Sequence, residues 1–125
     1  MFRLFVILGS INAFLGVALG AFGAHGLQSK LSEKLMATFE TGVQYHLIHA
    51  LGLLAIAFLC EKLGNSKLVS TAGWSLFAGI IFFSGSLYAY CMTEIKFLVF
   101  LTPIGGVFFL LGWVLLTIAA WKRKS

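Results

Sequence analysis

Residues 97–121 read FLVFLTPIGGVFFLLGWVLLTIAAW and carry no charged side chain over their whole length. About 20 apolar residues in a helix span the hydrocarbon core of a bilayer, because each residue adds about 1.5 Å of length. The strands of a membrane β-barrel would instead alternate apolar and polar residues. Since the apolar residues here occupy consecutive positions, this stretch predicts a membrane-spanning helix.

The composition of the chain indicates the same environment. Of its 125 residues, 60% are hydrophobic and 10% are charged, and the mean hydropathy is +1.00. Soluble domains have about 45–50% apolar and about 25% charged residues, and a chain this short cannot bury the excess in one globular core. The sequence therefore predicts a single membrane domain over residues 1–125, with membrane lipid as a partner.

The same criteria mark three further spans, and a polar stretch separates the first two spans. Ser32, followed by Glu33, suits a helix start, and the apolar residues after it recur at helical spacing. We therefore expect an all-α, four-helix membrane bundle with a short amphipathic helix at the interface. Gly64-Asn65 is a turn signal between the second and third spans. The expected spans cover residues 4–24, 42–60, 68–91 and 97–121, and the interfacial helix covers residues 30–40.

The basic residues indicate how the bundle is oriented. The net charge is +5, but the basic residues lie near span ends and not in one patch, so nucleic acid is not a predicted partner. Six of the nine fall on the side of the termini, and the positive-inside rule then predicts a multi-pass cell-membrane protein with both termini in the cytoplasm. The six are Arg3, Lys62, Lys67, Lys122, Arg123 and Lys124, and the other three are Lys30, Lys34 and Lys96.

Hydrogen-bonding side chains gather in the half of the bundle away from the termini. They come from four different segments, and polar residues within a membrane face the bundle interior or a cavity because lipid cannot hydrogen-bond them. We therefore expect a ligand-binding site in this outer half. The candidate ligand-binding residues are His25, Gln44, His46, His49, Ser84, Ser86, Tyr88 and Thr102.

The histidines allow a second interpretation. His46 and His49 are three residues apart, so they share a helix face in the outer turns of the second span. With His25 they could complete a metal site, or two of them could hold a haem. We favour hydrogen bonds between helices, because no acidic or cysteine ligand is clearly paired with the histidines. Glu40, the nearest carboxylate, is expected at the start of the second span, where the helix dipole favours an anion.

Small residues form stripes on the first and third spans and open the fourth. Gly16 and Gly20 form a small-xxx-small pattern that promotes close helix association, and Asn12 beside them could hydrogen-bond across an interface. Pro103 is tolerated in the first turn of a helix. Faces not used inside the chain would support a homo-oligomer. The candidate packing residues are Gly9, Ala13, Gly16, Gly20, Gly79, Gly85, Gly105 and Gly106.

Five segments lie in order along almost the whole chain: GAFGAHG (20–26), GVQYxxxHAL (42–51), FSGSLY (83–88), TPIGG (102–106) and GW (112–113). In these segments the chain resembles the domain-of-unknown-function 423 family of small bacterial membrane proteins, which has a eukaryotic transmembrane relative. The resemblance implies a four-helix membrane protein and supplies no activity. The family pattern often has Gln where this chain has His46, so it favours His25 and His49 as candidate ligands.

Three functions remain open on this basis, and the cofactor is unknown. We favour a non-enzymatic binding or interaction module, because the sequence lacks a nucleophile–base set or a carboxylate pair positioned for acid–base chemistry. One alternative is a metal- or haem-binding protein that uses His25 and His49. The other is a small transporter or proton-linked carrier subunit with histidine as the proton carrier.

Overall fold

The computed structural model describes residues 1–63 and 67–123, which are helical apart from short links. The residues 64–66, with the expected Gly64-Asn65 turn, lie outside the described residues, as does Lys124. Two segments are π-helical (η1 and η2) and one is a 3₁₀ helix (η3). The elements are α1 (Phe2–Phe22), η1 (Gly23–Leu27), α2 (Glu33–Lys62), α3 (Lys67–Gly79), η2 (Ile80–Ser84), α4 (Gly85–Thr93), η3 (Lys96–Phe100) and α5 (Leu101–Lys122).

These elements join into long rods within the described part of the chain. Four such rods, called the first to the fourth rod below, are long and apolar enough to cross a membrane: Phe2–Leu27, Glu33–Lys62, Lys67–Thr93 and Lys96–Lys122. This result confirms the all-α four-helix bundle that the sequence predicts. Each rod extends past the expected span because the flanking polar residues continue the helix into the interface.

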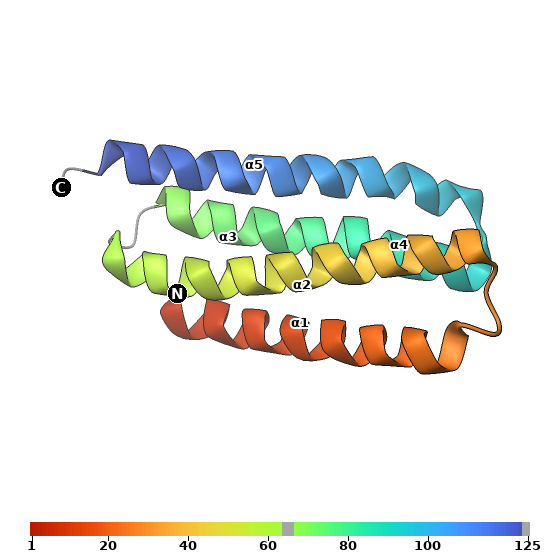
Figure 1. Cartoon of the computed structure of the whole chain (residues 1–125). Coiled ribbons are helices and arrows are strands. Elements are labelled where there is room, and N and C mark those ends of the chain that lie inside the picture. Colours follow the sequence, from red (N-terminus) through yellow and green to blue (C-terminus); the bar gives the residue numbers. More distant parts are fainter. Residues whose placement is uncertain (64–66, 124–125) are drawn as a thin grey trace.

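The bundle has two distinct ends (Figure 1). Both termini, the end of α2 and the start of α3 lie at one end, which we call the terminal end. The links between α1 and α2 and between α4 and α5 lie at the opposite, loop end. The helix α1 packs mainly against α2, and α3 packs mainly against α5. The short link after Thr93 makes the third and fourth rods antiparallel neighbours, as the sequence predicts.

The separate interfacial helix expected over residues 30–40 is wrong. Ser32 does cap a helix, since its Oγ accepts a hydrogen bond of 3.2 Å from the backbone N–H of Leu35. That helix continues without a break to Lys62 and is about 45 Å long. A break at the membrane edge would leave backbone N–H and C=O groups unpaired, whereas a continuous helix pairs them.

The core divides into an apolar part and a polar part. Side chains that are fully buried near the terminal half of the bundle are apolar, among them Phe5, Leu53, Ile56 and Leu76. Most buried polar side chains, among them Asn12 and Ser84, lie further towards the loop end or near the helix midpoints, and Ser75 on α3 is an exception. The functional site is therefore sought in the second region.

Candidate functional site

One group of buried polar side chains joins three helices around His46. The Nε2 atom of His46, on α2, lies 2.9 Å from the Oδ1 atom of Asn12 on α1. Its Nδ1 atom lies 2.9 Å from the hydroxyl of Tyr88 on α4. The Nδ2 atom of Asn12 donates in turn to the carbonyl oxygen of Leu8 at 2.8 Å. We call Asn12, His46 and Tyr88 the His46 bridge.

The direction of each hydrogen bond in the His46 bridge follows from the bond between Asn12 and the carbonyl oxygen of Leu8. The Leu8 carbonyl can only accept, so the amide nitrogen of Asn12 faces it and Oδ1 faces His46. His46 must then carry its proton on Nε2 and donate to Asn12. Its Nδ1 is left as an acceptor, to which the Tyr88 hydroxyl donates. Both nitrogens of a neutral His46 are therefore used.

A second group surrounds His49, three residues further along α2. The indole Nε1–H of Trp113, on α5, donates to the Nε2 atom of His49 at 3.0 Å. The Nδ1 atom of His49 lies 2.8 Å from the carbonyl oxygen of Tyr45. The imidazole also stacks on the ring of Phe109, with centroids 3.6 Å apart and an interplanar angle of 9°. His49 is 4% exposed.

These contacts fix the chemical form of His49. Because the indole N–H of Trp113 can only donate, Nε2 of His49 must be the unprotonated nitrogen. Its proton therefore lies on Nδ1 and is donated to the Tyr45 carbonyl. A protonated imidazolium would place two N–H groups against each other at Trp113. His49 is thus held neutral, with no nitrogen left for a metal.

The serines stabilise the contacts of the third rod with its neighbours. The hydroxyl of Ser84 donates to the carbonyl oxygen of Gly42 at 2.8 Å. Ser86 donates to the carbonyl of Phe83 at 2.9 Å, so its single proton is used and Thr102 is the donor in the 2.6 Å bond between Ser86 and Thr102. Ser84 lies in η2, a π-helical segment in which backbone hydrogen bonds join residues five apart and not four, a feature that often marks functional sites.

The sequence prediction for the histidines needs a correction. His46 and His49 lie near the midpoint of α2, about 20 and 24 Å from its start at Glu33, because the helix begins before the expected span. The three histidines also do not converge, since His25 is exposed in η1 while His46 and His49 bond to different helices. Within residues 1–63 and 67–123, no group of three His, Cys, Asp or Glu residues could hold a metal ion.

Two other residues named from the sequence lie outside these groups. Gln44 is exposed on α2 and faces α1 rather than His46 or His49. Glu40 was expected at the start of the second span, but it lies in the third turn of α2.

The glycines named for helix packing differ in how tightly they are enclosed. A Cβ atom on Gly9 would lie 3.0 Å from the backbone oxygen of Ala50, and one on Gly105 would overlap the backbone of Phe83. Gly16, Gly20 and Gly79 face side chains of a neighbouring helix, and the half-buried Ala13 lies on the same rod as the first two. Gly85 and Gly106 have more room, since the nearest atom to either Cβ would be 4.0 Å away.

Sequence reasoning did not identify Trp113 and Phe109 as partners of His49. Trp113 could have been noticed, because tryptophan in a membrane span is typical of the interface and this one lies in the middle of α5. The preceding Gly112 explains its position: a Cβ there would lie 3.1 Å from the backbone oxygen of Ala72, so α3 and α5 approach closely.

A cavity of about 440 Å³ lies beside His49 on the outer surface of the bundle. Its wall includes Val107 and Leu110, which are 63% and 68% exposed, so the cavity opens sideways between the helices. We call it the aromatic groove. It is lined by Tyr45, His49, Phe83, Pro103, Gly106, Val107, Phe109, Leu110 and Trp113.

Four long apolar helices that enclose hydrogen-bonded polar side chains define a polytopic, α-helical integral membrane protein. The chain belongs to the family described as protein of unknown function DUF423, whose model matches residues 19–106. The resemblance inferred from the sequence motifs is thereby confirmed.

The similar proteins are also described as membrane proteins. The UPF0382 membrane protein YwdK of Bacillus subtilis is 53% identical over 120 residues, which cover 96% of this chain and 98% of that protein. UPF0382 membrane proteins of Staphylococcus aureus and Staphylococcus epidermidis are 50% and 49% identical, each over 96% of this chain and 97% of the relative. No solved structure matches the chain.

Proposed function

We propose that this protein is a non-enzymatic binding protein of the membrane that takes part of a neutral, lipid-soluble molecule into the aromatic groove. The volume of about 440 Å³ lies within the range of small-molecule sites. The groove is walled by rings and opens towards the acyl chains, so a ligand can enter from the bilayer. Its wall favours a flat or ring-shaped apolar group.

The observation that carries the proposal is the hydroxyl of Tyr45. Tyr45 is 39% exposed and lines the groove, and its ring is nearly parallel to those of His49 and Phe109, with interplanar angles of 11° and 12°. Its hydroxyl has no hydrogen-bond partner among the described residues. A hydroxyl without a partner in apolar surroundings costs about 1–3 kcal/mol, so a ligand carbonyl that accepts from it would be stabilised.

The hydrogen bonds of the two buried histidines support a binding role over catalysis. General acid–base chemistry needs a ring nitrogen within reach of a substrate. Both nitrogens of His46 and both nitrogens of His49 already have protein partners. The histidines therefore shape and rigidify the walls, and Tyr45 supplies the polar contact.

Fluorescence of Trp113 tests this function directly. A variant with Trp74→Phe and Trp121→Phe keeps Trp113 as its only indole, and it is reconstituted in phosphatidylcholine vesicles. Decyl-benzoquinone, which has a ring, two carbonyls and an alkyl chain, serves as the probe and the quencher. We expect saturable quenching, because the probe occupies a site in contact with Trp113.

Two substitutions on α5 separate occupancy of the groove from random collisions. Gly106→Leu fills the groove without overlap at its Cβ, whose nearest neighbour would be 4.0 Å away, and should weaken saturable binding at least about fivefold. Val114→Leu, on the exposed surface outside the groove, should leave binding unchanged. Quenching that rises linearly in all three proteins would refute the proposal.

The orientation inferred from the charges forms part of the same proposal. Arg3, Lys62, Lys67, Lys122 and Arg123 lie at the terminal end, and this excess of basic residues supports cytoplasmic termini. Alkaline phosphatase fused after residue 125 should then be inactive in intact cells, whereas a fluorescent protein at the same position should be bright. The reverse pattern would invert the topology.

A further inference from the structure

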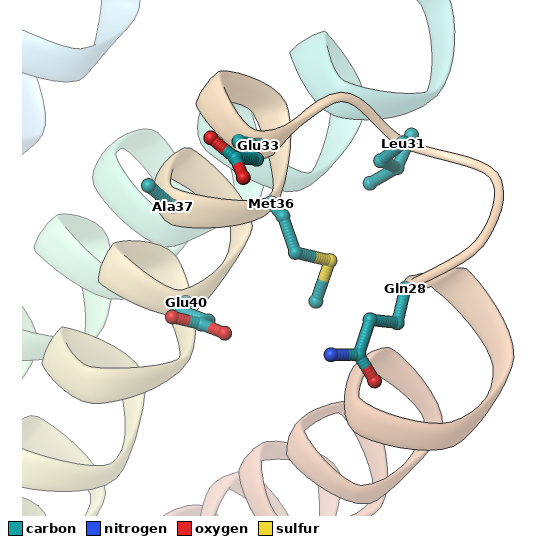
Figure 2. A pocket seen from close by; sticks show the side chains of 6 residues that line it. All are labelled: Gln28, Leu31, Glu33, Met36, Ala37 and Glu40. Atoms are coloured by element: carbon teal, nitrogen blue, oxygen red, sulfur yellow. The ribbon is translucent and has the colours of Figure 1, made fainter.

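A second groove lies at the loop end, between the end of the first rod and the start of α2, and shares no lining residue with the aromatic groove. It consists of two adjoining hollows of about 220 and 400 Å³, with Met36 and Glu40 in the wall of both. Figure 2 shows Gln28, from the end of the first rod, across from Met36 and Glu40 of α2. We call both hollows together the acidic groove. Its remaining lining residues are Gly20, Gly23, Ala24, Leu31, Glu33, Ala37, Phe39, Val43, Gln44 and Leu47.

The charges that line the acidic groove are all negative. Glu33 and Glu40 supply carboxylates, and among the described residues no Lys, Arg or His side chain forms part of the lining. Lys30 and Lys34 lie nearby in sequence, but both are exposed and outside the wall. Gln28 and Gln44 contribute neutral amides at its two ends.

Glu40 has no structural role that accounts for it. Glu33 lies in the first turn of α2, where the helix dipole stabilises a carboxylate. Glu40 lies seven residues further along, beyond the reach of that effect. Among the described residues it has neither an ion pair nor a hydrogen bond. Glu40 is exposed and lines both hollows, so its carboxylate is free to meet a ligand there.

The deeper hollow is apolar and follows directly from Glu40. One wall comes from Gly20, Gly23 and Ala24 of the first rod, and Val43 and Leu47 of α2 form the other wall. Phe39 and Val43 pack closely over Gly23 and Gly20, so the open part of the hollow lies beside the exposed Ala24. The groove thus runs from carboxylates at the membrane edge to an apolar recess. A ligand that matches both parts carries a positive charge at one end and a hydrocarbon chain at the other.

We propose that the acidic groove binds a lipophilic cation, with its ammonium group beside Glu40 and Glu33 and its alkyl chain in the recess between α1 and α2. A phospholipid fits less well, because its phosphate would meet two carboxylates and no basic side chain of the lining. A neutral alcohol would leave the carboxylates without a counter-charge. The ligand class differs from that of the aromatic groove in charge and in shape.

Binding of radiolabelled dodecylamine to the protein in phosphatidylcholine nanodiscs tests this inference, with empty discs as the background. The intact chain should bind the amine saturably, and Glu40→Gln should weaken binding about tenfold. Glu61→Gln, an exposed position at the other end of α2, is the matched control and should have no effect. Equal binding by the two variants would overturn the proposal.

Four further measurements identify the occupant and the groove. Ala24→Leu, at an exposed position of the recess, should also weaken binding of the amine, and its failure to do so would exclude the recess. Dodecanol should not compete with the labelled amine. Competition equal to that of unlabelled amine would show that the groove does not recognise the positive charge. Phosphatidylethanolamine added to the discs should not displace the amine, and displacement would assign the groove to a phospholipid. Gly106→Leu should leave binding of the amine intact, so that failure of the aromatic groove is distinguishable from failure here.

Discussion

Replacement of Gly105 by alanine should destabilise the bundle by about 3 kcal/mol or more, although it adds only one methyl group. The added Cβ would meet backbone atoms of Phe83 in η2, including its Cα at 2.7 Å. A backbone cannot rotate away as a side chain can, so α5 would have to move off the third rod. That movement would also lengthen the hydrogen bond between Thr102 and Ser86.

The neighbouring residue provides the control. Gly106→Ala places its Cβ 4.0 Å from the nearest atom, so it should be neutral or stabilise the helix by up to about 1 kcal/mol. The free energy of unfolding, measured by denaturant titration in mixed micelles, gives the comparison. Equal stability of the two alanine variants would show that the close approach of α5 to Phe83 is incorrect.

Replacement of Asn12 by leucine should cost about 1–2 kcal/mol, even though leucine is more apolar and of similar size. Asn12 and His46 are 6% and 4% exposed, so the Nε2–H of His46 would lose its acceptor in a place that water cannot reach easily. An unpaired buried donor carries its full desolvation penalty. The unfolding titration in micelles measures this cost as well.

A fully apolar version of the His46 bridge separates the lost hydrogen bond from altered packing. Asn12→Leu combined with His46→Leu and Tyr88→Phe removes every polar group of the bridge, and replacement of all partners can be nearly neutral. This triple variant should therefore be more stable than Asn12→Leu alone. If it is less stable, the bridge contributes through shape and not through paired donors and acceptors.

The membrane class and the four helices follow from the sequence because they depend on local quantities. An uncharged run such as residues 97–121 has no other stable location, and its length matches the bilayer. The helix boundaries do not follow from local composition alone. Residues 33–41 are polar enough to suggest a separate element, but backbone hydrogen bonding makes them the first turns of α2.

The candidate site was predictable in part of its composition and not in its arrangement, since His25 and Gln44 are exposed and Tyr45, Phe109 and Trp113 were not foreseen. The sequence indicated that His46, His49, Ser84, Ser86, Tyr88 and Thr102 would be shielded from lipid, and the structure describes hydrogen bonds for each of them. It also suggested that the two histidines of α2 act together. Positions three apart differ by roughly 60° around a helix. That angle is enough to direct His46 towards Asn12 of α1 and His49 towards Trp113 of α5.

The amino-acid sequence by itself determined that this chain forms four membrane-spanning helices and that most of their polar side chains must face the bundle interior. Both properties depend only on which residues occur and on their spacing. Only the tertiary structure decided that Trp113 donates to His49, that His46 donates to Asn12, and that Glu40 has no ion pair among the described residues. The physical reason is that a hydrogen bond is formed over about 3 Å. Which atoms come that close depends on how helices distant in sequence pack, and glycines such as Gly105 and Gly112 set that packing.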